Sequence, residues 1–300
     1  MTLSSLTALE ASAKQAGVNL TAILVDDAST DGTVAAVRSA FAWVEVIESS
    51  GSLYWNRGMH KGFGLALQRP ADYYLWINDD TVLLPDAVER LLKQSVQLQA
   101  VEGKPVIVVG ATAERGSNNI SYGGRVARSR FRPFAFELVW SESEPVPCET
   151  MEGNCVLIPH GVAMRVGNLD PFFEHAMGDT DYALRAGRQG FKLFVGAGIV
   201  GFCSRNPAVG TYFDKSLPLR TRWRLMLGRK GLPVRSWLHF TRRHGGPLWP
   251  MYFLWPYAKL ICPALSFSFS AFWSEKGCSD EHVHVAGPVH AHLETHASPA

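Results

Sequence analysis

The chain has few cysteines, and they form no metal-binding or disulfide pattern. Its 300 residues contain five of them, at Cys148, Cys155, Cys203, Cys262 and Cys278. No two form a CxxC pair, so the sequence favours neither a disulfide framework nor a cysteine zinc site. Scattered cysteines of odd number are typical of a protein from a reducing compartment. We therefore expect a cytoplasmic location.

A secretory signal is also lacking, because residues 1–17 contain no apolar run. Leu6, Leu9 and Ala13 instead recur at helical spacing. The long apolar stretch comes late, from Trp249 to Trp273, and holds three prolines and one lysine. Its length could span a bilayer, but these residues argue against a simple span. The sequence leaves open whether the stretch spans, lies on or ignores a membrane.

Neither sign of charge dominates the whole chain. Lys and Arg number 29 against 27 Asp and Glu, a net charge of +2 that does not indicate a nucleic-acid partner. Residues 205–244, however, carry ten basic residues and one acid, a net +9, so the other 260 residues carry −7. Basic charge leading into an aromatic, apolar run suits the face of an anionic bilayer. A solvated basic helix packed on the domain explains the same charge equally well.

Apolar runs and helical periodicity alternate along the first two-thirds of the chain. The expected strands are residues 22–25, 44–47, 73–77, 106–109, 156–158 and 192–200. The expected helices are residues 33–41, 58–67, 85–96 and 180–189. This rhythm predicts an α/β protein with a Rossmann-like, mostly parallel sheet flanked by helices. Residues 118–149 lack helical periodicity and predict antiparallel strands and loops over one end of the sheet. No GxGxxG follows a strand, which argues against a dinucleotide oxidoreductase.

Two of the expected strands end in paired acids. Asp26 and Asp27 follow the first strand, and Asp79 and Asp80 follow the third. Ligands of open parallel sheets bind at the carboxyl ends of strands, so the two pairs would lie at one edge. Adjacent carboxylates repel each other, and Mg²⁺ with substrate phosphates would relieve that repulsion. Capping of the following helix explains each pair as well, and the sequence leaves both explanations open.

Two further segments lie at the expected starts of helices. Asp179 begins one helix, and the helix N-terminus by itself favours a carboxylate there. Alternatively, on a loop facing a metal site, the same carboxylate could act as a general base. Residues 55–58, Trp-Asn-Arg-Gly, open a helix between the two acidic strands. Backbone N–H groups there could meet a phosphate, with added charge from Arg57.

Together these segments resemble the family-2 glycosyltransferases, which have a GT-A fold. The resemblance covers about residues 3–204, and its segments are VDDASTDGT at 25–33, LYWNRGM at 53–59, LWINDDT at 75–81, GNCVLIP at 153–159 and GDTDYALRA at 178–186. Each is weak alone, but five in order are specific. The run at 53–59 and the aspartates near Asp179 are most similar to rhamnosyltransferase-like and cell-envelope polysaccharide members.

The resemblance implies roles for four aspartates. It implies that Asp27 contacts the nucleotide base. It implies that Asp79 and Asp80 form the acidic metal-binding motif, with Asp80 the direct ligand of Mg²⁺ or Mn²⁺. Asp179 would be the base that deprotonates the acceptor hydroxyl. The implied reaction is an inverting transfer of a hexosyl or deoxyhexosyl group from a nucleoside-diphosphate sugar to a glycan or lipid-linked acceptor.

Five more positions receive roles from the resemblance. Asn56 and Arg57 would bind the nucleotide sugar. Gly153 and Asn154 would line the sugar and acceptor pocket, and Asp181 would support the base. The alternatives are a non-catalytic relative that binds a nucleotide sugar or glycan, and a sugar nucleotidyltransferase. A sugar nucleotidyltransferase would require a glycine-rich loop with Lys or Arg after its first strand, and the sequence shows no such loop.

The chain departs from the family pattern at two points. Gly178 stands where the family often has an acid before the base. The family's first strand, which lies centrally in the sheet, is also missing before the helix that begins near Ser4. Its loss would leave two neighbouring strands with unpaired backbone groups, so we expect an N-terminally truncated chain.

Composition divides the chain into three expected parts. Residues 1–204 would form the GT-A domain. Residues 205–275 would form a basic, aromatic, helical extension, either associated with the inner face of the plasma membrane or packed on the domain. Residues 276–300 carry five of the ten histidines and predict a disordered tail.

Overall fold

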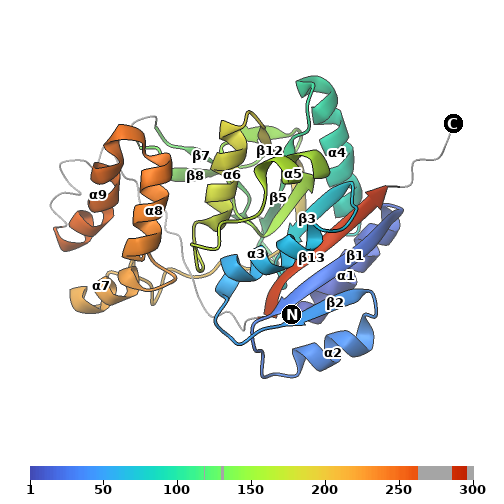
Figure 1. The fold of residues 1–300 in the computed structure, drawn as a ribbon, viewed down its shortest axis with the longest axis horizontal. Helices are drawn as coiled ribbons and strands as arrows, with labels where there is room; N and C mark the ends of the chain where they lie inside the picture. The colour runs from blue at the N-terminus through green and yellow to red at the C-terminus, as the bar shows by residue number, and fades with distance from the viewer. Residues whose placement is uncertain (118, 130–131, 263–285, 296–300) are drawn as a thin grey trace.

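The computed structural model describes residues 1–117, 119–129, 132–262 and 286–295. Ten strands form one mixed sheet with the order β2-β1-β13-β3-β11-β5-β12-β4, with β6 beside β5 and β9 beside β12 (Figure 1). These strands are β1 (Val18–Asp26), β2 (Val44–Glu48), β3 (Tyr73–Ile77), β4 (Val82–Leu83), β5 (Ile107–Ala113), β6 (Ile120–Tyr122), β9 (Val146–Cys148), β11 (Cys155–Pro159), β12 (Leu193–Phe202) and β13 (Ala286–Thr295). A small sheet contains β10 (Thr150–Met151), β7 (Gly124–Ala127) and β8 (Phe136–Val139).

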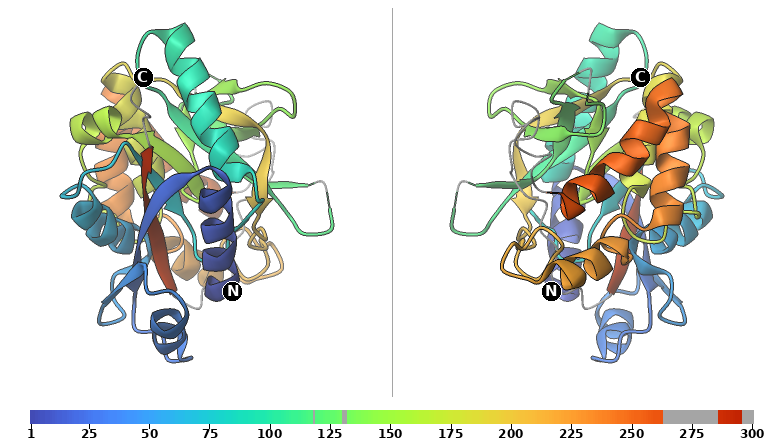
Figure 2. Two further views of the ribbon diagram at one scale, coloured as in Figure 1. Left: turned by 90° about the vertical axis from the view of Figure 1, so that its right-hand side faces the viewer. Right: turned by 90° about the vertical axis from the view of Figure 1, so that its left-hand side faces the viewer.

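Helices cover both faces of the large sheet (Figure 2). Those of the first two-thirds are α1 (Thr2–Gln15), α2 (Thr33–Ala40), α3 (Tyr54–Ala66), α4 (Ala87–Glu102), α5 (His160–Val166) and α6 (Gly178–Arg188). The α/β class and the helix-flanked sheet expected from the sequence are confirmed. All the expected helices and strands are present. The sequence did not predict α5 and β4, because both are too short to show a periodic pattern.

The pairing within the sheet differs from the expectation of a mostly parallel sheet. Strands β1 and β2 pair in parallel, as do β5 and β12. Strand β11 lies antiparallel between β3 and β5, and β13 lies antiparallel between β1 and β3. The main strands therefore point the same way, but oppositely directed strands separate them. The reason is that β11 returns from the inserted residues after β10 instead of through a crossover helix.

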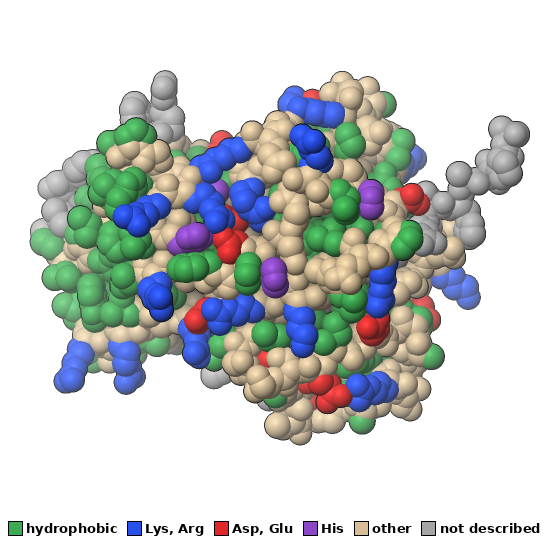
Figure 3. All heavy atoms as spheres, in the orientation of Figure 1, with side chains coloured by type: hydrophobic (Ala, Val, Ile, Leu, Met, Phe, Trp, Pro, Cys, Tyr) green, Lys and Arg blue, Asp and Glu red, His purple; other side chains and the backbone are tan. Residues whose placement is uncertain are grey.

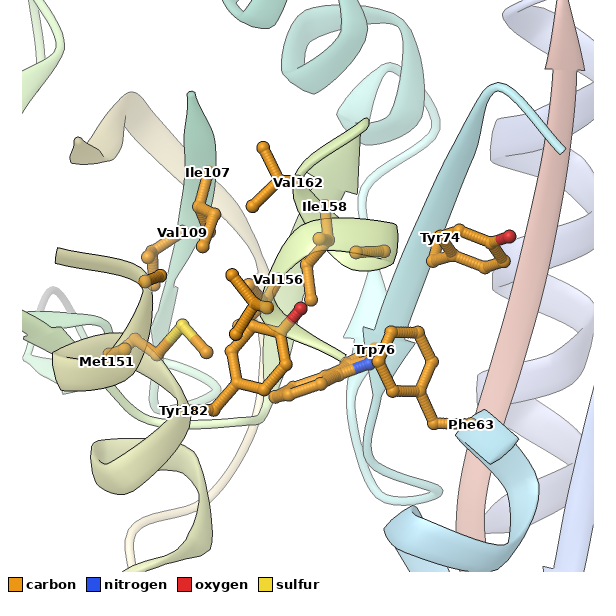
Figure 4. Packing of buried hydrophobic residues seen from close by; sticks show 14 of the residues in the cluster. Phe63, Tyr74, Trp76, Ile107, Val109, Met151, Val156, Ile158, Val162 and Tyr182 are labelled. Carbon is orange, nitrogen blue, oxygen red and sulfur yellow. The ribbon is translucent and has the colours of Figure 1, made fainter. Parts of the chain in front are cut away.

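Alternation along the strands divides the core into two layers, because successive side chains of a strand point to opposite faces. Tyr74 and Trp76 pack with α3 and α6, whereas Leu75 and Ile77 pack with α1 and α4. All four side chains are buried. The first layer is aromatic: the Trp76 ring lies 5.2 Å from that of Phe63 and 4.8 Å from that of Tyr182 (Figure 4). This contact fixes α3 and α6 against the same strand.

The C-terminal third adds helices α7 (Leu219–Leu227), α8 (Val234–His244) and α9 (Trp249–Ile261), with a 3₁₀ turn at Gly246–Leu248. The helical extension expected after residue 204 is thereby confirmed. Its core packs Met226, Trp237 and Phe240 around Phe173, which comes before α6 in the chain. None of the helices in the described residues has both the length and the apolar composition needed to cross a membrane. Of the stretch from Trp249 to Trp273, the structure describes the residues up to Cys262, and the rest lies outside the described part of the chain.

The expected disordered tail is wrong for residues 286–295, which form β13. Strands β1 and β3 point the same way with room for one strand between them, and β13 hydrogen-bonds to both. The unpaired strand edges expected from the sequence are therefore not found between β1 and β3. Val289, Ala291 and Leu293 alternate with histidines, a period of two that fits a strand and that the histidine content obscured. The remaining tail residues lie outside the described part of the chain.

Candidate functional site

The candidate site lies where β3 ends and β11 begins. Because these strands are antiparallel, with Ile77 opposite Cys155, residues 78–80 and residues 153–154 meet at the same edge of the sheet. The backbone N–H of Asn78 donates to the carbonyl of Asn154 at 3.2 Å. Cys203, at the end of β12, completes the edge. The acidic segment and the Gly-Asn segment expected to share one site are therefore together.

Asp79 and Asp80 are both partly buried and have few partners. The Thr2 hydroxyl donates to Asp79 Oδ2 at 2.9 Å, and the Cys203 thiol donates to Asp80 Oδ1 at 3.4 Å. Burial and the charge of Asp80 raise the pKa of Asp79 to about 7. Burial also raises the pKa of Asp80. The pair is thus two carboxylates whose negative charge the protein leaves largely uncompensated.

This donor set fits a hard divalent cation. Adjacent carboxylate oxygens are the ligands that Mg²⁺ and Mn²⁺ prefer, and Mg²⁺ uses one or two of them together with phosphates and water. Within the described residues, no group of three His, Cys, Asp or Glu side chains could hold a metal by itself. Any cation here would therefore need ligands from a bound substrate as well as from Asp79 or Asp80.

Asp179, at the start of α6, comes to the same site through Gly153. The N–H of Gly153 donates to Asp179 Oδ2 at 3.1 Å, and the N–H of Thr180 donates to Oδ1 at 2.7 Å. Burial raises the pKa of Asp179, although these two hydrogen bonds and the charge of Arg125 oppose the rise. A carboxylate whose pKa is raised is a better general base. The geometry therefore fits the role that the sequence predicts for Asp179.

An ion pair that the sequence did not single out lies beside Asp179. Arg125, on β7, pairs with Glu152 at 2.5 Å, and Glu152 directly precedes Gly153. Burial raises the pKa of Glu152, Arg125 opposes this, and Asp179 adds to it. Glu152 and Asp179 are therefore neighbouring acids that share one compensating arginine.

Trp55 connects three of the sequence segments and was also missed as a site residue. Its indole N–H donates to Asn78 Oδ1 at 2.8 Å. A Cβ atom on Gly153 would lie 2.3 Å from the Trp55 ring, so position 153 requires glycine. Asn154 is buried, and its amide contacts the sulfur of Cys203 at 3.4 Å. Gly153 and Asn154 therefore contact Trp55 and Cys203 at this edge of the sheet, and their contact with a sugar stays a prediction.

Asp27 holds a loop. Its carboxylate accepts hydrogen bonds from the N–H groups of Gly51, Leu53 and Tyr54, each at 2.9 Å. Burial alone would raise the pKa of Asp27, but these bonds and one from Ser49 outweigh it and lower the pKa. The carboxylate thus anchors the segment that leads into α3. Contact with a nucleotide base remains a prediction for this residue.

The Asn56 side chain faces into the protein, whereas the sequence predicts that it binds the nucleotide sugar. Its side chain has no exposed surface, and its amide donates to the carbonyls of Asp170 at 2.8 Å and Phe173 at 2.7 Å. Asn56 faces into the protein because it begins α3 on the side that packs against the 170–173 loop. The residue therefore positions the loop that precedes α6.

Arg57 points toward the same loop. Its Nε donates to the carbonyl of Pro171 at 3.1 Å, and it pairs with Glu174 at 3.5 Å. It also lines a hollow of about 480 Å³ on the outer side of α3, together with His60 and Lys61. Contact between Arg57 and a nucleotide sugar remains a prediction.

Asp181 is fully buried and supports α6 from behind. It accepts hydrogen bonds from Arg185, Arg243 and His244, each at 2.8 Å. Burial would raise its pKa, but these partners outweigh it and lower the pKa to about 2. Arg243 and His244 belong to α8, so Asp181 ties the helix that begins at Asp179 to the C-terminal helices. The supporting role predicted for Asp181 is therefore structural, through the placement of α6.

Residues 6–153 match the model of the family described as "Glycosyl transferase family 2". Among solved structures, the chain is similar to the mannosyltransferase PcManGT from Pyrobaculum calidifontis in complex with GDP-Man and Mn²⁺, with 18% identity, a TM-score of 0.44, and coverage of 84% of this chain and 66% of that one. It is similar to GalNAc-T7 with UDP, GalNAc and Mn²⁺, with 11% identity, a TM-score of 0.43, and coverage of 60% and 38%.

The chain is also similar to TarS of S. aureus, with 13% identity, a TM-score of 0.41, and coverage of 73% of this chain and 36% of that one. The chain spans between 36% and 66% of the length of these three structures. No curated protein matches it.

Proposed function

We propose that the protein transfers a sugar from a nucleoside-diphosphate sugar to an acceptor hydroxyl, because residues 6–153 match the model of glycosyl transferase family 2. The observation that carries the proposal is the placement of Asp79, Asp80 and Asp179. Two hydrogen bonds connect the segments that bear them: the N–H of Asn78 donates to the carbonyl of Asn154, and the N–H of Gly153 donates to the carboxylate of Asp179. The pKa of each of the three carboxyls is raised by burial.

We assign the cation to the Asp79–Asp80 pair, with Asp80 the direct ligand and Mg²⁺ or Mn²⁺ the ion. When bound, a divalent cation there would neutralise charge on the diphosphate as it leaves. Asp79 and Asp80 lie at one edge of the candidate site, and the donor phosphates would supply the ligands that the described residues do not. The uncompensated charge of the pair supports this assignment.

Asp179 is the proposed catalytic base. The acceptor oxygen forms a bond to the anomeric carbon while the bond from that carbon to the diphosphate oxygen breaks, and the hydroxyl proton passes to Asp179. Attack from the side opposite the leaving group inverts the anomeric centre. Gly153 and Asn154 lie between the base and the acidic pair, where the sugar would sit. The N–H groups of Gly153 and Thr180 orient the Asp179 carboxylate for this transfer.

Finer features of the function follow from the sequence resemblance alone. We propose that the catalytic domain is residues 1–204, that the transferred group is a hexose or deoxyhexose, and that the acceptor is a glycan or lipid-linked glycan of a cell-envelope polysaccharide. The reaction would take place in the cytoplasm, at the inner face of the plasma membrane. No nucleic acid would be involved.

A donor screen tests the proposal. The full chain is incubated with common nucleoside-diphosphate sugars and either Mg²⁺ or Mn²⁺, and release of nucleoside diphosphate and binding of each donor are measured. We expect release with at least one donor, dependence on the cation, and loss of release in Asp179→Asn with donor binding retained. Binding without turnover in both the wild type and Asp179→Asn would instead identify a non-catalytic relative. Release of pyrophosphate from a nucleoside triphosphate and a sugar phosphate would identify a nucleotidyltransferase.

A further inference from the structure

Helix α9 exposes apolar side chains beside the ones that it buries. Tyr257 and Leu260 pack into the C-terminal core. Met251, Leu254 and Ile261 are instead 52%, 59% and 58% exposed, and their spacing of three and seven residues puts them in one stripe that adjoins the buried side chains. A helix that is apolar all round is normally covered on all sides, in a core or by a membrane. The exposed stripe of α9 therefore needs an occupant.

The charge around this stripe has one sign. From Lys215 to Cys262 the chain has ten Lys and Arg and no Asp or Glu. Five of these cations are exposed and make no ion pair within the described residues: Arg220, Arg224, Lys230, Arg235 and Arg242. In the space-filling view, hydrophobic side chains gather at the end of the molecule that α9 occupies, and Lys and Arg side chains border them (Figure 3). Apolar contact and positive charge thus occur on the same surface.

Helix α7 continues the pattern. Arg220, Arg224 and Leu227 recur at spacings of four and three residues, and all three are exposed. Helix α8 adds Arg242, whose guanidinium lies 4.8 Å from the centre of the Trp249 ring at the start of α9. Tryptophan beside arginine is typical of the membrane interface, where the ring meets the headgroups and the cation meets lipid phosphate. The side chains therefore fit the chemistry of a lipid surface.

We propose that α7 and α9 form a docking surface for an anionic bilayer, with α9 lying in the plane of the interface. Met251, Leu254 and Ile261 would enter the boundary between headgroups and acyl chains, and the arginines would contact anionic headgroups. A protein partner would need a matching acidic rim, and neither α7 nor α9 contains an Asp or Glu that could pair with the cations of a second copy. The inference does not depend on the transfer reaction, because the surface contains none of the residues at the Asp79–Asp80 edge.

Co-sedimentation of the full chain with vesicles tests the docking surface. The vesicles are phosphatidylcholine alone, or phosphatidylcholine with phosphatidylglycerol, at low and high salt. We expect binding to the anionic vesicles only, and weaker binding at high salt. The double variant Arg220→Gln with Arg224→Gln should lower partitioning about 30-fold, about fivefold for each arginine. The variant Met251→Ser with Leu254→Ser should also lower binding, without changing the thermal unfolding midpoint, because both side chains are exposed.

Matched controls come from α4, which exposes Val96 and Lys93 outside this surface. Val96→Ser and Lys93→Gln should bind vesicles as the wild type does. The proposal is overturned if the folded wild type ignores anionic vesicles, if it binds both vesicle types equally, or if the α7 and α9 variants bind like the controls. It is also overturned if light scattering without lipid shows a dimer that Met251→Ser with Leu254→Ser dissociates, since a second copy would then cover the stripe.

Discussion

The side-chain oxygen of Asn56 occupies the space that any side chain at position 178 would need: an ideal Cβ on Gly178 would lie 1.6 Å from Asn56 Oδ1. The same amide donates to the carbonyls of Asp170 and Phe173. The start of α3 and the start of α6 are therefore fitted to each other, one residue before the proposed base. This explains why glycine stands where the family often has an acid: in this chain Asn56 fills that space.

Gly178→Ala tests this fit. We expect a loss of about 1–3 kcal/mol in the free energy of unfolding, because the added methyl group overlaps Asn56 in a packed region. Adding Asn56→Ala to Gly178→Ala should recover part of that loss, so the two changes should not be additive. Chemical denaturation of the two single variants and the double variant measures the coupling.

Gly187 on the same helix is the matched control. A Cβ there would meet no heavy atom within 4 Å, so Gly187→Ala should raise the free energy of unfolding by about 0.5–1 kcal/mol. Equal effects of the changes at 178 and 187 would contradict the proposed fit between Asn56 and Gly178.

The pKa of Asp79, raised to about 7, predicts an unusual pH dependence of stability. Its pKa in the unfolded chain is near 3.8, so between about pH 4 and pH 7 the folded state binds the proton and the unfolded state releases it. The contribution of Asp79 to stability should therefore fall as pH rises through this window. Asp79→Asn should raise the unfolding midpoint at pH 8 and flatten the dependence.

A divalent cation should have the same effect on the wild type at pH 8, because it compensates the charge pair. Thermal unfolding from pH 5 to pH 8, with and without Mg²⁺ or Mn²⁺, checks both results. If the wild type and Asp79→Asn show the same pH dependence of the unfolding midpoint, Asp79 does not titrate in this range.

Arg125 should control the acid limb of the reaction's pH profile. Its charge lowers the pKa of Asp179 against the effect of burial. Arg125→Met should therefore raise the pKa of Asp179, so that the acid limb of kcat/KM moves to higher pH. Adding Glu152→Gln removes the carboxylate that would otherwise be left buried without its arginine, and it should restore stability while leaving part of the pH shift.

Arg128→Met is the control for this experiment, since Arg128 follows the same strand but pairs with Glu137. Its pH profile should match that of the wild type. If the profile of Arg125→Met also stays in place, Asp179 does not set the acid limb.

The sequence predicted the acidic ends of the strands and the helix that begins at Asp179, because charge at a strand end and helical periodicity are local signals. It did not predict which residues would hold them in place. Trp55 bonds to Asn78 and packs on Gly153, and Cys203 contacts Asp80; each contact joins residues far apart in the chain. The end of β12 did offer a signal for Cys203, since ligands bind at the carboxyl ends of strands.

Asn56 shows the limit of the local signal most clearly. Its place at the start of a helix indicated an anion site, but its side chain turns inward because the 170–173 loop offers two carbonyl acceptors. That loop is more than a hundred residues away in sequence, so no pattern around Asn56 reveals it. The same reason applies to β13, whose partners β1 and β3 both precede it by more than two hundred residues.

Strand β13 provides the last prediction. His290 pairs with Ile23 of β1 and with Trp76 of β3, so it lies in the interior of the sheet. Proline there lacks the N–H of the ladder and is not tolerated in a central strand. His290→Pro should therefore abolish cooperative unfolding or lower its free energy by about 3 kcal/mol or more. His290→Thr, which suits a strand, should unfold like the wild type. Urea denaturation followed by circular dichroism compares the two, and equal stability of the proline and threonine variants would place residues 286–295 outside the sheet.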